Sequence, residues 1–149
     1  MVRLGIGLYG INVGGNESGI VPISKLKSVI IQTKNIQKGD SIGYGRKKIA
    51  EKEMTIAMLP IGYSDGLRRS LGNGNFSFYV NGKQGNTVGN ICMDITMIDI
   101  TGVKATVGDE VEIFGNQTTI ETMAKAMDTI PYEVLTSVSQ RVKRVFFHE

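Results

Sequence analysis

FSFYVNG at residues 76–82 points to a fold more directly than any other stretch of the chain. Apolar Phe76, Phe78 and Val80 alternate with more polar residues, which is the period of two expected of a half-buried β-strand. The pair Asn81-Gly82 that follows tolerates two positive φ angles. The stretch therefore predicts a strand that turns back through a type I′ hairpin.

Short strands separated by turns are predicted on both sides of this hairpin. They cover 26–36, 41–44, 53–59, 91–100 and 111–113, with turns at 37–40 and 107–109. Six or more strands, 19 glycines and few helices are typical of a closed barrel or a sandwich. Closure would remove the unpaired sheet edges, but periodicity does not choose between the two architectures.

Helical patterns occur only near the C-terminus. Thr118 and Glu121 have the spacing of a capping box, and an apolar stripe follows at Ile120, Met123, Ala124 and Met127. Pro131 suits the first turn of a second short helix that continues to residue 135. The predicted fold is mainly β, a small closed Greek-key-like barrel with one or two short helices near the C-terminus.

Composition limits the classes of function. The chain has 149 residues and a net charge of +3, from 17 basic and 14 acidic residues, which is too mild for a nucleic-acid binder. A single cysteine, Cys92, fits a reducing compartment. We expect a cytoplasmic protein with no nucleic-acid partner. No run of apolar residues is long enough for a membrane segment. No metal site is expected, because no His, Cys or Asp cluster has metal-ligand spacing.

Tyr44 is the first candidate for chemistry. It lies between two glycines in GYGR (43–46), where small neighbours would let a substrate approach a phenol that acts as a base. The alternative is a tyrosine that only packs in the core or at the rim of a β-strand. Tyr44 alone favours the packing role, and the other segments of the chain reverse that preference.

Five segments together are more specific than Tyr44 alone. In chain order the sequence resembles alanine racemase at RLGIGLYG (3–10), GYGR (43–46), GYSDG (62–66), NICMD (90–94) and IPYEVL (130–135). The resemblance covers nearly the whole chain but only the C-terminal part of that family's protein. It implies that residues 1–10 are a remnant of the last strand of the N-terminal pyridoxal-phosphate barrel, and that residues 11–149 are the C-terminal β-domain.

The resemblance implies a catalytic role for Tyr44. Racemisation removes the α-proton of an amino acid from one face and returns it to the other, so two bases must flank the α-carbon. In the family these are the lysine that holds the cofactor and a tyrosine from the partner subunit, which Tyr44 matches. A free phenol has a pKa of about 10 and needs neighbours that favour phenolate.

The resemblance also assigns a cofactor set. Arg3 matches the arginine that faces the pyridine nitrogen of pyridoxal 5′-phosphate. Gly5 and Ile6 match positions whose backbone N–H groups bind the phosphate, and Tyr132 matches a tyrosine whose hydroxyl reaches the same group. Without the family, Arg3 would be a surface arginine and Tyr132 an ordinary residue of an amphipathic helix.

Three further residues are implied at the substrate side. Met93 matches a residue whose backbone N–H holds the substrate carboxylate, and it is predicted on the apolar face of a strand. Tyr63 and Arg69 match residues that narrow the substrate entrance. The loop register between residues 66 and 71 leaves Arg68 as an alternative to Arg69.

The implied parent enzyme interconverts L- and D-alanine for peptidoglycan synthesis and is a head-to-tail homodimer. No lysine of this chain matches the one that holds the cofactor. We therefore expect this C-terminal fragment to be inactive alone, without covalently bound pyridoxal phosphate. Two alternatives stay open: the β-domain of another barrel-type pyridoxal enzyme, such as a serine racemase or an amino-acid decarboxylase, and a non-enzymatic barrel that serves as an interaction module.

Overall fold

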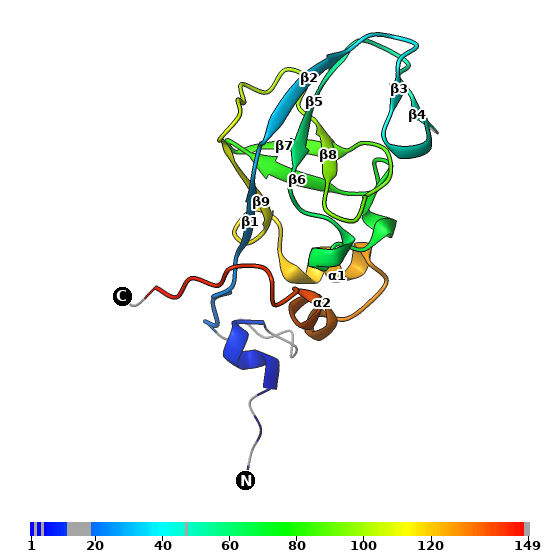
Figure 1. Cartoon of the computed structure of the whole chain (residues 1–149). Helices are drawn as coiled ribbons and strands as arrows, with labels where there is room; N and C mark the ends of the chain where they lie inside the picture. Colours follow the sequence, from blue (N-terminus) through cyan, green and yellow to red (C-terminus); the bar gives the residue numbers. More distant parts are fainter. Residues whose placement is uncertain (2, 4, 12–18, 47, 148–149) are drawn as a thin grey trace.

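The computed structural model describes residues 1, 3, 5–11, 19–46 and 48–147. Its main element is a seven-stranded antiparallel sheet in the order β1-β9-β6-β7-β8-β5-β2 (Figure 1). The strands are β1 (Leu26–Val29), β2 (Gln32–Ile36), β5 (Met54–Leu59), β6 (Ser77–Val80), β7 (Lys83–Thr87), β8 (Thr96–Asp99) and β9 (Glu110–Phe114).

A small hairpin and six short helices complete the described part of the chain. Strands β3 (Ser41–Ile42) and β4 (Lys48–Ile49) pair only with each other, and in Figure 1 they stand to one side of the main sheet. The two α-helices close the lower end of the sheet in that view. The helices are α1 (Ile120–Ala126), α2 (Pro131–Ser137) and the 3₁₀ turns η1 (Gly5–Tyr9), η2 (Tyr44–Arg46), η3 (Tyr63–Asp65) and η4 (Arg69–Leu71).

The two edges of the sheet belong to one chain segment. β1 pairs with β9, and β2, only two residues further on, pairs with β5. The change of partner occurs between consecutive residues: Ile30 N donates to Asp109 O at 2.9 Å, and Ile31 N donates to Met58 O at 2.9 Å. The sheet therefore curls into a half-barrel whose two edge strands, β1 and β2, are the two halves of 26–36.

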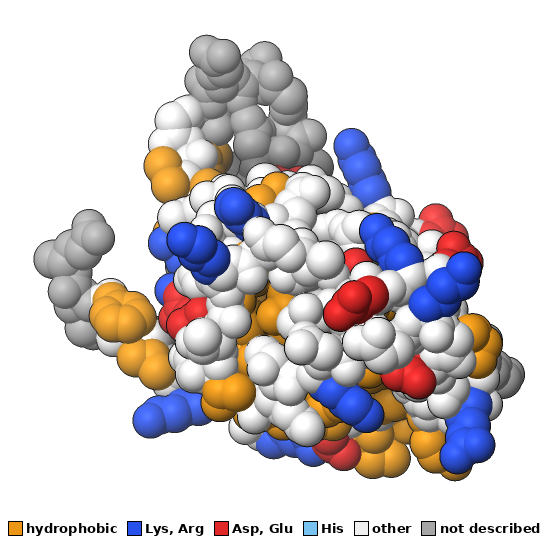
Figure 2. Space-filling view, turned by 90° about the horizontal axis from the view of Figure 1, so that it is seen from above, with side chains coloured by type: hydrophobic (Ala, Val, Ile, Leu, Met, Phe, Trp, Pro, Cys, Tyr) orange, Lys and Arg blue, Asp and Glu red, His pale blue; other side chains and the backbone are white. Residues whose placement is uncertain are grey.

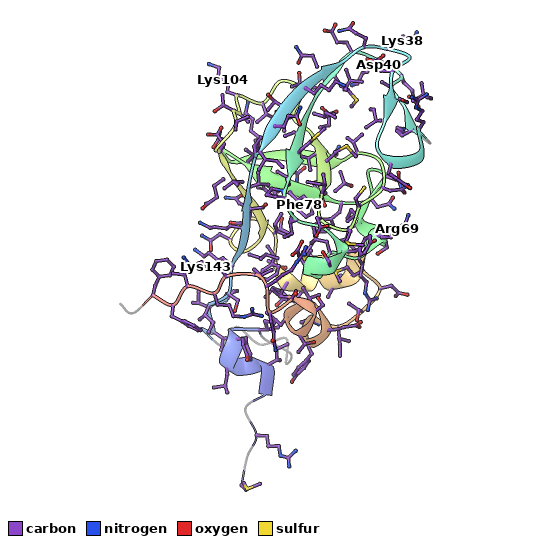
Figure 3. All side chains as sticks on the ribbon, in the orientation of Figure 1. Lys38, Asp40, Arg69, Phe78, Lys104 and Lys143 are labelled. Atoms are coloured by element: carbon purple, nitrogen blue, oxygen red, sulfur yellow. The ribbon has the colours of Figure 1, made fainter. Side chains whose placement is uncertain are left out.

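Phe78 marks the centre of the core. Its side chain is fully buried inside the curled sheet, where Figure 3 labels it, and its ring packs edge-on against Phe76 at 5.6 Å between centroids. The main cluster continues from the sheet to Met123 on α1 and Val134 on α2. A smaller second cluster lies between the main sheet and the β3–β4 hairpin and consists of Ile36, Ile42, Ala50, Ile56, Val88 and Met97.

The predicted mainly β fold, a small closed Greek-key-like barrel with one or two short helices near the C-terminus, is confirmed in the form of a curled antiparallel half-barrel sheet with two α-helices. The hairpin at 76–82 is also as predicted. Asn81 and Gly82 have φ angles of 50° and 75°, and Val80 pairs with Lys83 across a two-residue turn. The register of this hairpin is set by the two turn residues, Asn81 and Gly82, so it can be predicted from the sequence without any distant contact.

Two local predictions were wrong. The first helix is capped by Thr119 and not by Thr118, since the Thr119 side chain accepts a hydrogen bond from Thr122 N at 3.1 Å. Thr118 is buried, and its N–H donates to Glu112 Oε1 at 3.2 Å. Residues 91–95 do not form a strand. Cys92 N donates to Ile95 O at 2.9 Å, which closes a turn and leaves Met93 exposed instead of on an apolar strand face.

The N-terminal segment also differs from the expected strand remnant. Gly5–Tyr9 forms the 3₁₀ turn η1, bounded by positive φ angles at Gly5 and Gly10. A strand needs a neighbour to supply its hydrogen bonds, whereas here Gly10 N bonds locally to Gly7 O at 3.1 Å. Residues 2 and 4 of the segment 1–10 and residues 12–18 of the segment 11–149 lie outside the described residues.

Gly66 gives a test of how tightly η3 packs on α2. Gly66 and Gly108 both have positive φ angles, 110° and 96°, but a Cβ at Gly66 would lie 2.6 Å from Ser137 O, whereas one at Gly108 would meet open space. Both alanine variants carry the backbone strain of about 1 kcal/mol. Gly66→Ala should lower the free energy of unfolding by roughly 1–3 kcal/mol more than Gly108→Ala does, because the backbone at Ser137 must move to admit the new methyl group. Urea denaturation of the two variants measures this difference. Equal midpoints for the two variants would contradict this packing.

Candidate functional site

The structure brings three of the predicted cofactor residues together. Ile6 N donates a hydrogen bond to Tyr132 Oη at 3.2 Å, although the two residues are 126 positions apart. A Cβ at Gly5 would lie only 2.8 Å from the same oxygen, so a glycine keeps this approach open. Ile6 is buried and Tyr132 is half-exposed, so the phenol oxygen and the amide meet where the core reaches the surface.

Local sequence explains the position of Tyr132. Pro131 occupies the first turn of α2, and Val134 on the same helix is buried in the core cluster. Tyr132 is thus left at the exposed start of the helix, next to η1. Arg3 is exposed ahead of η1, and its predicted contact with the cofactor ring stays a prediction.

A groove of about 560 Å³ lies beside this contact. Ile6 and Tyr132 are among its lining residues, and β1, β9, α2 and the C-terminal segment also contribute apolar side chains, such as Leu26, Phe114 and Leu135. Lys143, labelled in Figure 3 on the C-terminal segment, adds a positive charge to the lining. Lys25 and Arg144 also line the groove, which is therefore mostly apolar with three basic side chains among its walls.

Tyr44 lies on the turn η2 between β3 and β4 and is neither buried nor in a strand, contrary to the sequence-based expectation. Its side chain is 85% exposed. Gly43 and Gly45 on either side have φ angles of 79° and 77°, which favour glycine and end the strand before Tyr44. A Cβ at Gly43 would also press against Met97 Cε at 3.1 Å. The glycines are thus required by the turn, and the turn presents the phenol to solvent.

Tyr63 and Met93 lie on two loops that are joined by their backbones. Tyr63 N donates to Cys92 O at 3.0 Å, and Ser64 N donates to Met93 O at 3.1 Å. Gly62 permits this approach, because a Cβ there would lie 2.3 Å from Met93 O. Tyr63 and Met93 are 44% and 54% exposed. Two residues predicted at the substrate side therefore share one exposed rim.

Arg68 and Arg69 have different surroundings. Arg68 donates to Met127 O at 3.0 Å and forms an ion pair with Glu133, so it joins the η3–η4 region to the two helices. Arg69 begins η4 and is exposed, and Figure 3 labels it on the outer side of the molecule. No carboxylate among the described residues lies within ion-pair distance of Arg69. The geometry therefore favours Arg69 over Arg68 as the arginine available at an entrance.

A cluster around Arg141 was not predicted from the sequence. Arg141 Nε donates to Asp65 Oδ1 at 2.6 Å, and its Nη2 donates to Asp94 Oδ1 and to Ser64 Oγ. Asp65 is buried, and its other oxygen accepts a hydrogen bond from Gly62 N at 2.8 Å. Arg141 is 76 positions from Asp65, and a single arginine near the C-terminus has no spacing signal that could have indicated this contact.

These contacts shift two pKa values. The hydrogen bond from Arg141, followed by the one from Ser64, holds the pKa of Asp94 below its usual range. Hydrogen bonds to Asp65 and then to Asp94 raise the pKa of Arg141. Both groups are therefore charged over the ordinary pH range, and the cluster is held by charge-assisted hydrogen bonds.

Two other classes of site find no support in the described part of the chain. None of its residues form a group of three His, Cys, Asp or Glu side chains suited to a metal ion. None of its helices has the length and hydropathy needed to cross a bilayer. On the face seen in Figure 2, described basic and acidic side chains are interspersed rather than gathered by sign.

Comparison with known proteins identifies the class of domain. Residues 23–146 match the family described as alanine racemase, C-terminal domain. The chain is 44% identical over 156 aligned positions to alanine racemase 2 of Caldanaerobacter subterraneus subsp. tengcongensis, with 99% of this chain and 40% of that protein covered. It is 43% identical to alanine racemase of Vesicomyosocius okutanii, with 95% and 40% covered.

Solved structures agree with this match. The alanine racemase of Bartonella henselae with covalently bound pyridoxal phosphate superposes with a TM-score of 0.90 at 33% identity, over 96% of this chain and 40% of that one. The Clostridium difficile 630 enzyme in complex with cycloserine gives 0.82 at 38% identity, over 91% and 37%. The shared class is a curled β-domain with two C-terminal helices. The chain belongs to the alanine racemase C-terminal domain family, and it spans about 40% of the length of the curated relatives it matches.

The lowered pKa of Asp94 can be tested by titration. Since the folded-state pKa lies below the unfolded-state value of about 3.9, the stability from this carboxylate is present above that value. It is lost as the pH falls through the folded-state pKa. In Arg141→Gln the pKa of Asp94 should rise toward its ordinary value, because the main hydrogen bond is removed. NMR titration of the carboxyl carbons measures this shift.

Asp109 is the internal control for that titration. Its pKa is also lowered, but by hydrogen bonds from Thr106 N–H and from Asn81, which do not involve Arg141. Its titration should be the same in the wild type and in Arg141→Gln. Identical Asp94 curves in the two proteins would show that the guanidinium is not the cause.

Proposed function

We propose that this chain is the C-terminal β-domain of a pyridoxal-phosphate-dependent alanine racemase that interconverts L- and D-alanine. Similarity to alanine racemases over almost the whole chain supports the proposal. In this proposal residues 1–10 end the cofactor-binding barrel and residues 11–149 form the β-domain. The complete enzyme would act in a bacterial cytoplasm and supply D-alanine for peptidoglycan.

The observation that carries the proposal is the contact between Ile6 N and Tyr132 Oη at 3.2 Å. In this contact the Tyr132 oxygen accepts from the Ile6 N–H, which leaves the phenol O–H of half-exposed Tyr132 to donate to a phosphate oxygen, and Gly5 leaves the space for a close approach. The residues present thus fit the phosphate end of pyridoxal 5′-phosphate. When bound, this cofactor supplies the electron sink that acidifies the α-proton of an amino acid.

Arg3 would face the pyridine nitrogen. An arginine stays protonated in proteins, so it donates hydrogen bonds to that nitrogen and disfavours a proton on it. This limits how much negative charge the ring accepts. A proton removed from the α-carbon should then return quickly, which suits racemisation better than competing reactions.

Tyr44 would act as the base on one face of the substrate. Its phenol is 85% exposed on the β3–β4 hairpin, so it reaches beyond its own domain. In a head-to-tail homodimer it would enter the site of the partner subunit, opposite the lysine that holds the cofactor. The backbone N–H of Met93 would bind the substrate carboxylate from the same side, and Tyr63 with Arg69 would narrow the entrance.

The 149-residue chain alone should not racemise alanine, because none of its lysines matches the one that would hold the cofactor. Incubation with pyridoxal phosphate and L-alanine, followed by chiral chromatography, should yield no D-alanine above a protein-free blank. The absorbance spectrum of the cofactor should show no new band from covalent attachment. Turnover by the chain alone would overturn this part of the proposal.

In the complete enzyme, Tyr44→Phe should lower kcat for racemisation by about 10²–10⁴-fold, the usual contribution of a general base. Since the lysine still serves the other face, α-proton exchange with D₂O should persist for one enantiomer only. Proton NMR in D₂O distinguishes exchange from racemisation.

Tyr79→Phe is the matched control for this experiment. Tyr79 lies in β6, where its hydroxyl accepts a hydrogen bond from Gln84 at 2.7 Å, and it has no proposed part in the reaction. It should leave kcat within about twofold of the wild type. If Tyr44→Phe behaved like Tyr79→Phe, the proposed role of Tyr44 would be wrong.

A further inference from the structure

We propose that Arg141 is a positioning residue that holds the Met93 loop in the geometry needed to bind the substrate carboxylate. The proposal rests on the proposed function, because it assumes that the Met93 N–H faces that carboxylate. Arg141 itself would not touch the substrate. It would act through Ser64, Asp65 and Asp94, which connect the C-terminal segment to two loops.

Arg141 contacts both loops at once. Its Nε donates to Asp65 Oδ1 at 2.6 Å on the η3 loop, and its Nη2 donates to Asp94 Oδ1, next to Met93. A guanidinium can serve several acceptors in fixed directions, which a lysine ammonium cannot reproduce. The relative position of the two loops is therefore set by one rigid planar group.

Ser64 carries the connection to Met93. Its Oγ accepts a hydrogen bond from Arg141 Nη2 and lies 2.6 Å from Met93 O and 3.1 Å from Asp94 Oδ1. A hydroxyl has one proton to donate, which Met93 O and Asp94 Oδ1 share, and the contact to Met93 O is the shorter of the two. Ser64 N also donates to Met93 O, at 3.1 Å. The Met93 carbonyl is thus fixed twice by a residue that Arg141 holds.

The Met93 loop is ordered by hydrogen bonds rather than by a strand ladder, so the contacts of Arg141 add to its backbone bonds with Tyr63 and Ser64. Residues 91–95 are not in a strand, and the side chain of Met93 is 54% exposed, so core packing does not fix its backbone. Buried Asp65 supplies the anchored end: one of its oxygens bonds Arg141, and the other bonds Gly62 N at 2.8 Å. The clamp therefore runs from the buried η3 turn to the exposed loop.

Cys92 is a built-in reporter of this loop. It is the single cysteine of the chain, it is partly buried, and its backbone carbonyl accepts the hydrogen bond from Tyr63 N. Its rate of reaction with a disulfide reagent such as 5,5′-dithiobis(2-nitrobenzoate) follows opening of the loop. In the 149-residue chain, Arg141→Gln should raise this rate by about tenfold, as expected for loss of a charge-assisted hydrogen bond. Arg141→Lys should give an intermediate rate.

The kinetic test uses the complete racemase. If the Met93 loop is less well fixed, its backbone N–H binds the substrate carboxylate more weakly, and equally so in the ground state and in the transition state. Arg141→Gln should therefore raise KM for alanine by about fivefold or more, with kcat within about twofold. Lys27→Gln is the control, because it removes an exposed ion pair with Glu110 (2.7 Å) on β1 and β9, away from both loops. It should change neither KM nor the Cys92 rate.

The outcomes separate this inference from the proposed function. An unchanged Cys92 rate in Arg141→Gln, or a faster rate with an unchanged KM, would overturn the role of Arg141 while racemase activity remained. An inactive wild-type enzyme would instead overturn the proposed function, and the role of Arg141 toward alanine with it. A faster Cys92 rate together with a selective rise in KM is the expected result.

Discussion

The structure depends on one segment, residues 26–36, that hydrogen-bonds to both ends of the sheet. Its first half pairs with β9 and its second half with β5, and the change of partner at Ile30 and Ile31 occurs without a break in the hydrogen bonding. The first and last strands of the sheet, β1 and β2, are adjoining parts of this one segment, which therefore joins the two ends of the sheet. The curl that results encloses Phe78 and the rest of the main core.

All of the candidate site residues lie outside this sheet. Gly5 and Ile6 are on η1, Tyr44 is on η2, Met93 is on an irregular loop, and Tyr132 begins α2. The arrangement is common in proteins, where a rigid scaffold holds loops that carry the chemistry. The backbone of such a loop is less well fixed than that of a strand, because it lacks the hydrogen-bond ladder of a sheet. Side-chain contacts such as those of Arg141 and Tyr132 supply the missing constraints.

Sequence reasoning succeeded where local rules decide the structure and failed where distant contacts do. The hairpin at Asn81 followed from turn chemistry, and the mainly β fold followed from alternation. The strand predicted over 91–100 was wrong for residues 91–95, because a turn closed by Cys92 N and Ile95 O interrupts it. The contact of Arg141 with Asp65 spans 76 positions and leaves no periodic trace. Tyr132 and Ile6 were linked only through the resemblance to a family.

The β3–β4 hairpin has a core of its own. Each of its strands has two residues, and the six buried side chains beneath it form a cluster apart from the main one. Native proteins open in cooperative units whose stability follows local packing. The hairpin can therefore be a separate unit of local unfolding, with a protection from hydrogen exchange lower than that of the main sheet. Fluctuations of the Tyr44 phenol would then follow this small apolar cluster, and not the global stability of the domain.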